Sequence, residues 1–485
     1  MSVDNLLAFD SERCFIGGSW QKSKNTKTVD LVNPSDGETL CRIAAGGKED
    51  IDLAVNAAST ALHGEWGTYT ALERGRVLAG MGQNVTENID KLAKLEALDV
   101  GKPIAQARAD AIALARYLEF YAGAADKVHG ETLPYLDGYT VYTLREAHGV
   151  TGHIVPWNYP MQIIGRSVGA ALAMGNACVL KPAEDACLTA LMFAELARQA
   201  GLPAGALNVV PGTGEEAGAA LASHAGVQHL SFTGSVGVGE LVQTQAARNI
   251  VPVTLELGGK SPQVVFNDAS LDEALPFLVN AGIQNAGQTC SASSRILVQR
   301  DVFDKLINMM SEKYRTLRAG PAELDYELGP LISSAQKARV ESYIAQDTGL
   351  ELIATGTVVN DAPASGNYVA PRLYTCNDPS HVLAQEEIFG PVQVVIPFDS
   401  EEQATAIANG TEFGLVASVW TSDGARQMRM ARKLRAGQVF INNYGAGGGV
   451  ELPFGGLGKS GHGREKGFDA LYGFSTLKTV AAKHN

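Results

Sequence analysis

In the first third of the chain, apolar residues recur at the three- and four-residue spacing that is typical of amphipathic helices. This spacing predicts helices over Ile51–Leu62, Ala71–Leu98 and Ile104–Tyr121. The second of these helices should break near Glu87, and the Gly101-Lys102-Pro103 segment is a stop signal ahead of the third. The amino-terminal region is therefore expected to be mainly helical.

From Gly149 onward, short apolar runs alternate with helical segments. The first series has the strand-like runs GVTGHIVPW, ACVLKP, ALNVVPG and HLSFTG, with helices at Ile163–Met174, Thr189–Ala200 and Glu215–Ser223. The second has SPQVVF, RILVQ, PVQVVIPF and ASVWT, with helices at Leu271–Asn280, Val302–Leu317 and Ala335–Gln346. Strands that alternate with helices form parallel sheets, so we predict an α/β fold with two α/β domains. Such sheets bind nucleotides at the carboxyl ends of their strands.

One segment between these regions has a different pattern. Thr140–Leu144 (TVYTL) alternates with a period of two and predicts a strand. The region from Lys127 to Leu144 is therefore a candidate arm that pairs with another element or another subunit.

Composition narrows the functional class. A chain of 485 residues is too long for a single hydrophobic core, so we expect two or three domains. Its net charge of −13 argues against nucleic-acid binding. The six cysteines form no CxxC pair, so we expect no metal site, no disulfide framework and a reducing compartment. No signal peptide or membrane span is evident, which favours a cytoplasmic protein.

Two glycine-rich segments are candidates for phosphate binding. Gly456 to Gly461 matches GxGxxG, but no strand precedes it and no clear helix follows, so we interpret it as a tight loop. Gly234 and Ser235 come directly after a predicted strand and would open a helix whose free N–H groups can meet a phosphate. A purely structural turn is an equally good interpretation of this second segment.

Two reactive side chains are candidates for catalysis. Cys290 has small, polar neighbours (NAGQTCSAS) that would admit a substrate, although a lone cysteine is more often a small buried hydrophobe. Glu256 lies in an apolar run before a double glycine, where it is either a helix cap or a base with a raised pKa.

Further polar residues follow the predicted strands. Asn158 in VPWNYP could donate to an oxyanion, and Lys181 and Glu184 end the next strand, where a ribose or phosphate would lie. The run Glu386–Pro391 (EEIFGP) is another polar candidate. Each of these residues could equally serve as a turn or cap residue.

Together these segments resemble the aldehyde dehydrogenase superfamily. PWNYP, KPAE, FTGS, LELGGKSP, GQTC, EEIFGPV and PFGGLGKSG occur in the family's order, and the resemblance runs from Asn33 through residue 461. It implies an NAD-binding domain (1–122 and 142–256), a catalytic domain (257–455) and a bridging arm for oligomerisation (123–141 and 466–485). It also implies a homodimer or homotetramer.

The resemblance assigns roles to individual residues. Cys290 would be the nucleophile, Asn158 and the Cys290 N–H the oxyanion hole, and Glu256 the base that activates water. The cofactor-binding residues that it implies are Trp157, Lys181, Glu184, Gly234, Ser235, Glu387 and Phe389.

The resemblance also bears on the type of enzyme. Glu256 favours hydrolysis of the thioester over transfer to a coenzyme thiol. Glu184 favours NAD over NADP, because a carboxylate can accept from the ribose 2′-hydroxyl but repels a 2′-phosphate. A reductase working in reverse with NADP is disfavoured because thioester hydrolysis is effectively one-way.

The substrate is the least determined feature. Arg166, eight residues after Asn158, stands where relatives that act on succinic semialdehyde have an arginine, so we expect a carboxylate-bearing aldehyde. The alternative is that Arg166 pairs with an acid of the protein. Tyr159 and Phe454 are assigned to the same substrate pocket, and the glycine-rich loop 445–449 suggests a roomy one. Neutral or amino aldehydes, or a non-catalytic NAD-binding relative, are the other possibilities.

Overall fold

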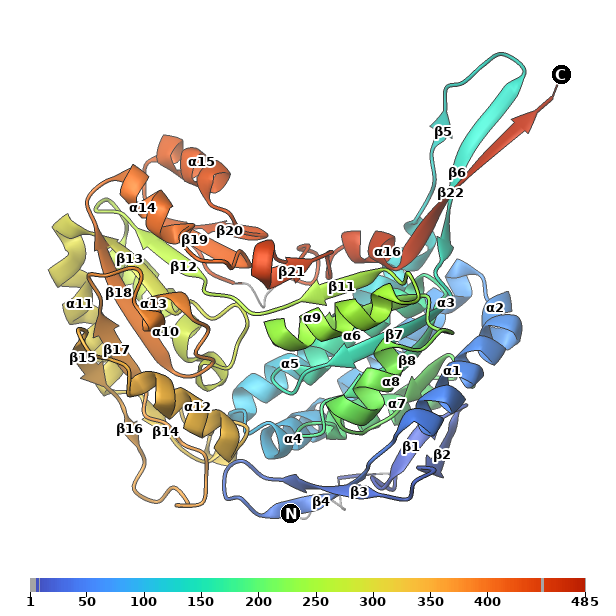
Figure 1. Ribbon diagram of the computed structural model, residues 1–485, viewed down its shortest axis with the longest axis horizontal. Helices are drawn as coiled ribbons and strands as arrows, with labels where there is room; N and C mark the ends of the chain where they lie inside the picture. The colour runs from blue at the N-terminus through green and yellow to red at the C-terminus, as the bar shows by residue number, and fades with distance from the viewer. Residues whose placement is uncertain (1–5, 8, 446–448, 485) are drawn as a thin grey trace.

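The computed structural model describes residues 6, 7, 9–445 and 449–484. Figure 1 shows two α/β bodies side by side and an arm that projects from one of them. Each body has its own hydrophobic core built around one sheet. The two α/β bodies predicted from the alternating pattern are therefore confirmed. The glycine-rich loop 445–449 lies partly outside the described residues, because 446–448 are not among them.

The first body contains an eight-stranded sheet in the order β2-β1-β9-β8-β7-β10-β11-β21. Its strands are β1 (Arg13–Ile16), β2 (Ser19–Lys22), β7 (Val150–Val155), β8 (Ala177–Pro182), β9 (Leu207–Val209), β10 (His229–Thr233), β11 (Val253–Glu256) and β21 (Gly461–His462). Strands β7 to β11 pair in parallel, while β1 and β21 join antiparallel at the two sides. The central strands therefore end at one common edge.

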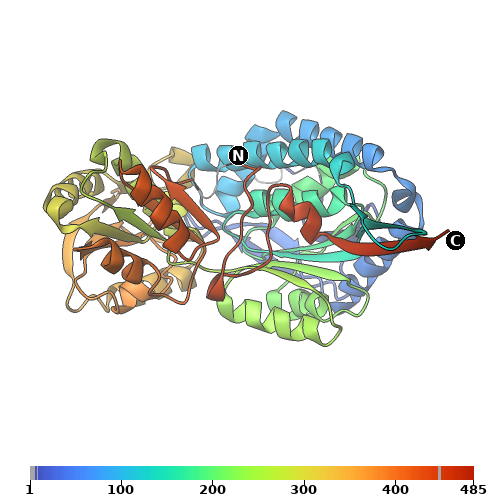
Figure 2. The same ribbon diagram turned by 90° about the horizontal axis from the view of Figure 1, so that it is seen from above.

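Helices cover both faces of this sheet. They are α1 (Lys48–His63), α2 (Glu65–Thr68), α3 (Ala71–Glu87), α4 (Ile89–Asp99), α5 (Ile104–Ala124), α6 (Pro160–Ala173), α7 (Leu188–Gln199), α8 (Ala219–Ala222), α9 (Val236–Ala247) and α16 (Asp469–Gly473). Figure 2 shows α3 to α5 above the sheet and α9 below it. The break predicted near Glu87 is present between α3 and α4. The helix predicted from Glu215 begins instead as a π-helical turn, Gly214–Gly218.

The second body contains a seven-stranded sheet in the order β15-β17-β18-β13-β12-β19-β20. Its strands are β12 (Pro262–Val265), β13 (Arg295–Gln299), β15 (Glu351–Thr355), β17 (Arg372–Thr375), β18 (Val392–Phe398), β19 (Val416–Trp420) and β20 (Gln438–Ile441). The helices of this body are α10 (Leu271–Ile283), α11 (Arg300–Arg315), α12 (Ser334–Ile344), α13 (Val382–Gln385), α14 (Glu401–Ala408) and α15 (Gly424–Lys433). Only β15 runs antiparallel to its neighbour.

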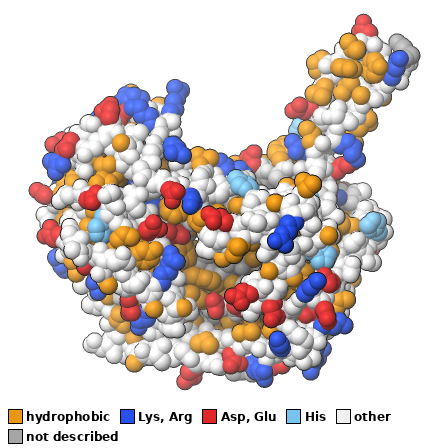
Figure 3. All heavy atoms as spheres, viewed as in Figure 1, with side chains coloured by type: hydrophobic (Ala, Val, Ile, Leu, Met, Phe, Trp, Pro, Cys, Tyr) orange, Lys and Arg blue, Asp and Glu red, His pale blue; other side chains and the backbone are white. Residues whose placement is uncertain are grey.

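The arm is a three-stranded sheet of β5 (Thr132–Leu133), β6 (Tyr139–Ala147) and β22 (Ser475–Lys483). The strand predicted at Thr140–Leu144 lies inside β6 and pairs along its length with the carboxyl-terminal strand. Tyr135, Leu136 and Leu477 are more than half exposed on this arm. Figure 3 shows hydrophobic side chains gathered towards its free end, an arrangement that is unusual for a lone subunit.

Shorter strands complete the chain: β3 (Thr28–Val32) pairs with β4 (Thr39–Ala44), and β14 (Arg318–Ala319) pairs with β16 (Thr357–Val358). The amino-terminal strands β1 to β4 were not predicted from the sequence, because they are short and their burial does not alternate. Within the described ranges, no helix is long and apolar enough to cross a membrane.

Candidate active site

A buried pocket lies where the two bodies meet, and it contains the thiol of Cys290. The first body contributes Asn158, Tyr159, Arg166 and Thr233 to its wall, and the second contributes Thr289, Cys290 and Ser291. Two residues from the last part of the chain, Phe454 and Lys466, complete it. The pocket therefore brings together the predicted nucleophile, Asn158 and all three predicted substrate residues.

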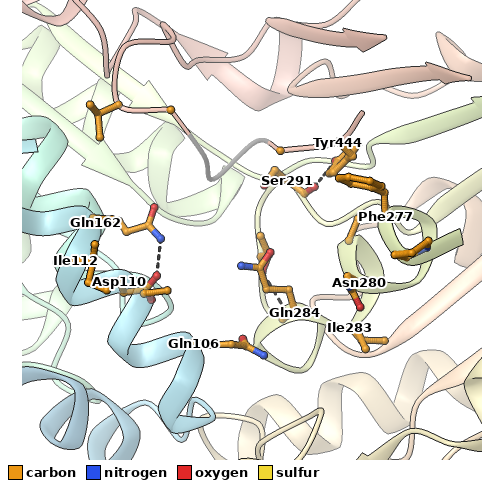
Figure 4. Close-up of a pocket in the computed structure, with 18 of the residues that line it drawn as sticks. Gln106, Asp110, Ile112, Gln162, Phe277, Asn280, Ile283, Gln284, Ser291 and Tyr444 are labelled. Carbon is orange, nitrogen blue, oxygen red and sulfur yellow. Dashed lines mark hydrogen bonds between the residues drawn. The ribbon is translucent and has the colours of Figure 1, made fainter. Parts of the chain in front are cut away.

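A wider cavity of about 940 Å³ adjoins this pocket (Figure 4). The two share Tyr117, Gln162, Gln284, Thr289 and Ser291 as wall residues. The larger cavity therefore provides a passage to the thiol. In Figure 4, Gln162 on the first body and Gln284 on the second face each other across it.

The loop that carries Cys290 has an unusual backbone. Asn285 and Ala286 have φ values of 49° and 54°, and Gly287 follows with 76°. Side chains rarely adopt this left-handed conformation, which costs about 1–2 kcal/mol for each non-glycine residue. A Cβ added at Gly287 would lie 2.2 Å from the Gly390 carbonyl oxygen, so glycine is required there. The loop needs neighbours that hold it in place.

Those neighbours come from three separate elements. The Asn285 N–H donates to Gln106 Oε1 of α5 at 2.9 Å. The Asn285 amide donates to the backbone oxygen of Asn158 at 3.1 Å. On the other side, Gln288 Oε1 accepts from the Ile332 N–H at 2.9 Å. The position of the nucleophile therefore depends on contacts across the interface between the bodies.

Asn158 follows β7 and is itself almost fully buried. Its Nδ2 donates to the Gln288 backbone oxygen at 3.0 Å. A side-chain amide has two N–H donors, so this bond fixes the group and leaves the second donor for a ligand in the pocket. The geometry is compatible with an oxyanion donor beside Cys290.

The thiol of Cys290 is not activated in this arrangement. Burial raises its pKa to about 12, while the guanidinium of Arg166 acts in the opposite direction. The thiol is therefore mainly protonated at neutral pH, and a bound ligand or a base must favour the thiolate.

Glu256 ends β11 and is 1% exposed. Neither carboxylate oxygen has a hydrogen-bond partner among the described residues. Burial first, and then the nearby Glu465, raise the pKa of this carboxyl well above its usual value, while Arg166 and Arg464 lower it. A Cβ at Gly455 would lie 2.8 Å from Glu256 Oε1, so glycine leaves room for the carboxylate. A helix cap would accept a backbone N–H, and Glu256 has no such partner among the described residues, so its burial and raised pKa are compatible with the predicted general base.

Arg166 lies in the pocket but already has an acidic partner. Its Nε forms an ion pair with Glu465, whose other oxygen accepts from Ser231 Oγ at 2.7 Å. Its guanidinium carbon also lies 5.0 Å from the centre of the Phe454 ring. The alternative left open by the sequence, pairing with an acid of the protein, is therefore present. Whether Arg166 also contacts a substrate stays a prediction.

The predicted cofactor residues of the first body lie at the ends of adjacent strands. Lys181 Nζ is 2.8 Å from Glu184 Oε2 at the end of β8, and Glu184 Oε1 accepts from the Gly214 N–H at 3.2 Å. Ser235 precedes the first turn of α9, and its side chain forms no cap there. Ribose and phosphate groups are typically bound at such an edge.

The second body contributes the other two predicted cofactor residues, Glu387 and Phe389. Glu387 Oε1 accepts from the Gly259 N–H at 3.0 Å, and burial raises the pKa of this carboxyl to about 7. The Phe389 ring meets Trp157 edge-on, with centroids 5.5 Å apart. Cβ atoms at the double glycine Gly258-Gly259 would lie 2.4 Å from Glu387 and 2.5 Å from the Cys290 carbonyl oxygen. The double glycine therefore allows both groups to approach.

Sequence reasoning missed Lys466 in the pocket wall and two buried charged residues outside it, Glu465 and Lys102. Lys466 has a left-handed backbone (φ 62°) and a pKa lowered to about 8 by burial and then by Arg166. The residue before it in the chain, Glu465, is fully buried. Lys102 was interpreted only as part of a helix stop. No motif in the chain signals that these charged residues are buried. Within the described ranges, no group of three or more metal-ligating side chains is found.

Comparisons with known proteins agree with this geometry. The model of the aldehyde dehydrogenase family matches residues 20–480. The chain is 40% identical to the hydroxyisobutyraldehyde dehydrogenase of Mycolicibacterium austroafricanum, with 96% of this chain and 92% of the relative covered. It is 62% identical to a crystal structure of a provisionally named aldehyde dehydrogenase from Burkholderia cenocepacia (TM-score 0.97; 98% and 100% covered). The NAD⁺ complex of an aldehyde dehydrogenase from Bacillus cereus is 38% identical (TM-score 0.96; 100% and 98% covered).

Proposed function

Because this chain belongs to the aldehyde dehydrogenase family, we propose that it oxidises an aldehyde to a carboxylate with NAD⁺, through a covalent intermediate on Cys290. The arrangement of three side chains supports this proposal. The thiol of Cys290 and the amide of Asn158 line one buried pocket, and beside it the buried Glu256 carboxylate has no hydrogen-bond partner among the described residues.

In the first step, the Cys290 thiol loses its proton to solvent, the thiolate sulfur attacks the aldehyde carbon, and a C–S bond forms while the C=O π bond opens. The carbonyl oxygen becomes an alkoxide, which the Asn158 amide and the Cys290 N–H stabilise as hydrogen-bond donors. Arg166 supports this step, because its guanidinium lowers the pKa of the thiol.

The polar residues at the strand ends of the first body, together with Glu387 and Phe389 of the second body, fit a dinucleotide. Lys181 and Glu184 would hold the adenosine ribose, the amino-terminal turn of α9 at Ser235 would meet the pyrophosphate, and Glu387 with Phe389 would hold the nicotinamide side. When bound, NAD⁺ supplies the hydride acceptor for the oxidation. Loss of hydride from the Cys290 thiohemiacetal leaves a thioester on the same sulfur.

Glu256 then completes the turnover. Its carboxylate takes a proton from water, the resulting hydroxide attacks the thioester carbon, and the C–S bond breaks to release the Cys290 thiolate and a carboxylic acid, which loses its proton to solvent. The raised pKa of Glu256 supports this role, because a higher pKa makes its carboxylate a stronger base towards water.

Glu184 supports NAD⁺ over NADP⁺. Its carboxylate is available to accept from a 2′-hydroxyl, and its charge would repel a 2′-phosphate. The ion pair with Lys181 balances part of that charge, so the proposal is a preference and not an absolute exclusion.

For the substrate, Arg166 remains a proposed carboxylate contact. The hydroxyisobutyraldehyde dehydrogenase relative supports the alternative of a neutral, hydroxyl-bearing aldehyde. Arg166→Ala, compared with wild type on a semialdehyde and a neutral aldehyde of equal length, distinguishes them. A selective loss of semialdehyde turnover supports the carboxylate contact, and an unchanged preference excludes it.

The proposed function is tested by NADH absorbance with a panel of neutral, amino and carboxy aldehydes. Cys290→Ala should abolish turnover, while Cys41→Ala, a control cysteine outside the pocket, should retain it. Binding of NAD⁺ without turnover of any aldehyde by wild type would favour a non-catalytic binding protein instead.

The exposed apolar arm supports assembly into a homodimer or homotetramer. Replacing Leu136 and Leu477 with serine should shift the mass measured by light scattering towards the monomer. Among the described residues, Cys14, Cys178, Cys187, Cys290 and Cys376 form no disulfide, which supports a reducing, cytoplasmic location.

A further inference from the structure

A buried charge cluster lies behind the nucleophile pocket, on the side of the first body. Lys102 is fully buried between α4 and α5. Its ammonium lies 2.5 Å from Glu96 Oε1 and forms a second ion pair with Asp110. Burial alone would lower the pKa of Lys102, but Asp110 and Glu96 hold it above the usual value, so the amine stays charged. The proposed chemistry does not use this group.

Two routes lead from Lys102 to the pocket wall. In the first, the ammonium lies 3.9 Å from the centre of the Tyr159 ring, and the Tyr159 hydroxyl shares a hydrogen bond of 2.9 Å with Thr289 Oγ1. Thr289 directly precedes Cys290. In the second, the carboxylate oxygen of Asp110 that does not pair with Lys102 accepts from Gln162 Nε2 at 2.5 Å, and Gln162 lines the pocket. Figure 4 shows this Asp110–Gln162 contact beside the passage.

A buried charge of this kind costs energy unless it is paired, and it orients whatever pairs with it. Here the paired groups point at the loop that carries the nucleophile. That loop contains two residues in a left-handed conformation and so depends on outside contacts. We propose that Lys102 is a positioning residue, which fixes Tyr159 and Asp110 and, through Thr289 and Gln162, the place of the Cys290 thiol.

This inference rests on the proposed function only in taking Cys290 as the reactive thiol. Its test therefore includes a readout that needs neither aldehyde nor cofactor. That readout is the second-order rate constant for alkylation of Cys290 by iodoacetamide, followed by mass spectrometry of the Cys290 peptide.

Tyr159→Phe and Thr289→Val each remove one end of the hydroxyl bond but keep the side-chain volume. Each should change the alkylation rate constant about threefold or more and lower kcat, with the KM for NAD⁺ unchanged, because a nucleophile that is slightly misplaced loses reactivity. The matched control is Tyr314→Phe, which removes a buried hydroxyl in the other core and should alter neither quantity.

Lys102→Met alone leaves Glu96 and Asp110 buried without their cation, and it can prevent folding. The compensated variant combines Lys102→Met with Glu96→Gln and Asp110→Asn, which leaves no buried charge without a partner in the cluster. If this variant folds, it should show the Tyr159→Phe phenotype, and adding Tyr159→Phe to it should produce little further change. Lys102→Arg, which keeps the positive charge, should retain part of the wild-type alkylation rate constant and kcat.

Two results would overturn the proposal. One is a folded compensated variant with wild-type kcat and wild-type alkylation. The other is wild-type alkylation and kcat in both Tyr159→Phe and Thr289→Val. If Cys290→Ala retains turnover, the proposed function fails instead, and the alkylation comparison still decides whether Lys102 positions this thiol.

Discussion

The nucleophile loop and the cofactor edge are built in opposite ways. The strand ends that carry Lys181, Glu184 and Ser235 belong to the parallel part of one sheet, and the contacts of Lys181 and Glu184 stay within the first body. The loop that carries Cys290 has left-handed residues, and it is held by hydrogen bonds from α5, from the turn after β7 and from Ile332. Cofactor binding should therefore survive changes that disrupt the nucleophile.

Gly287→Ala should give the largest difference between the two regions. The added Cβ would meet the Gly390 carbonyl oxygen at 2.2 Å, and φ is left-handed. We expect kcat to fall roughly 100-fold through displacement of the thiol, with the Kd for NAD⁺ within a few-fold of wild type. Steady-state kinetics and a cofactor titration measure both.

The matched control is Gly123→Ala in α5, where an added Cβ meets nothing within 4 Å. Higher helix propensity should stabilise it by up to about 1 kcal/mol, seen as an unchanged or slightly raised Tm with wild-type kcat. Equal losses in both variants would show that the nucleophile loop is not specially constrained.

Glu184→Gln tests the other region. Removing the carboxylate charge should raise kcat/KM for NADP⁺ roughly tenfold, the scale of one charge–charge contact near a surface. The rate of Cys290 alkylation should not change, because the two regions are built separately. Coupled changes in both quantities would contradict that separation.

In the folded enzyme, Arg166→Met should give the smallest kinetic effect, a shift of the pH profile. Because this variant leaves Glu465 buried without its cation, circular dichroism first checks that it is folded. The guanidinium lowers the pKa values of both Cys290 and Glu256. Without it, both groups ionise at higher pH, so the rising limb of kcat against pH should move upward. A limb that stays in place or moves to lower pH would remove Arg166 from the electrostatics of this pocket.

Much of the fold could be predicted because its elements are long and periodic. The helices at α1 and α3 to α5, the central strands β7 to β10, β12, β13, β18 and β19, and the arm strand follow directly from spacing. The amino-terminal strands could not be predicted, because they are short and their burial does not alternate. The strands β11, β15, β17, β20 and β21 were not predicted either.

The candidate site divides in the same way. Cys290, Glu256 and Asn158 lie in motifs whose order points to their chemistry. The pairing of Arg166 with Glu465, and the burial of Lys102 beside Tyr159, join residues far apart in the chain. Spacing along the sequence carries no information about such contacts, so only the packing of α4 to α6, and of the segment after β21 against α6, reveals them.

The central claim is that oxidation proceeds through a thioester on Cys290 that Glu256 helps to hydrolyse. The most direct measurement is intact and peptide mass spectrometry of Glu256→Gln after mixing with NAD⁺ and a turned-over aldehyde. General bases typically contribute at least about 100-fold, so this variant should release about one NADH per site in a burst and then stall. We expect an acyl group on the Cys290 peptide. Full steady-state turnover, or a stalled enzyme without an adduct on Cys290, would contradict the account.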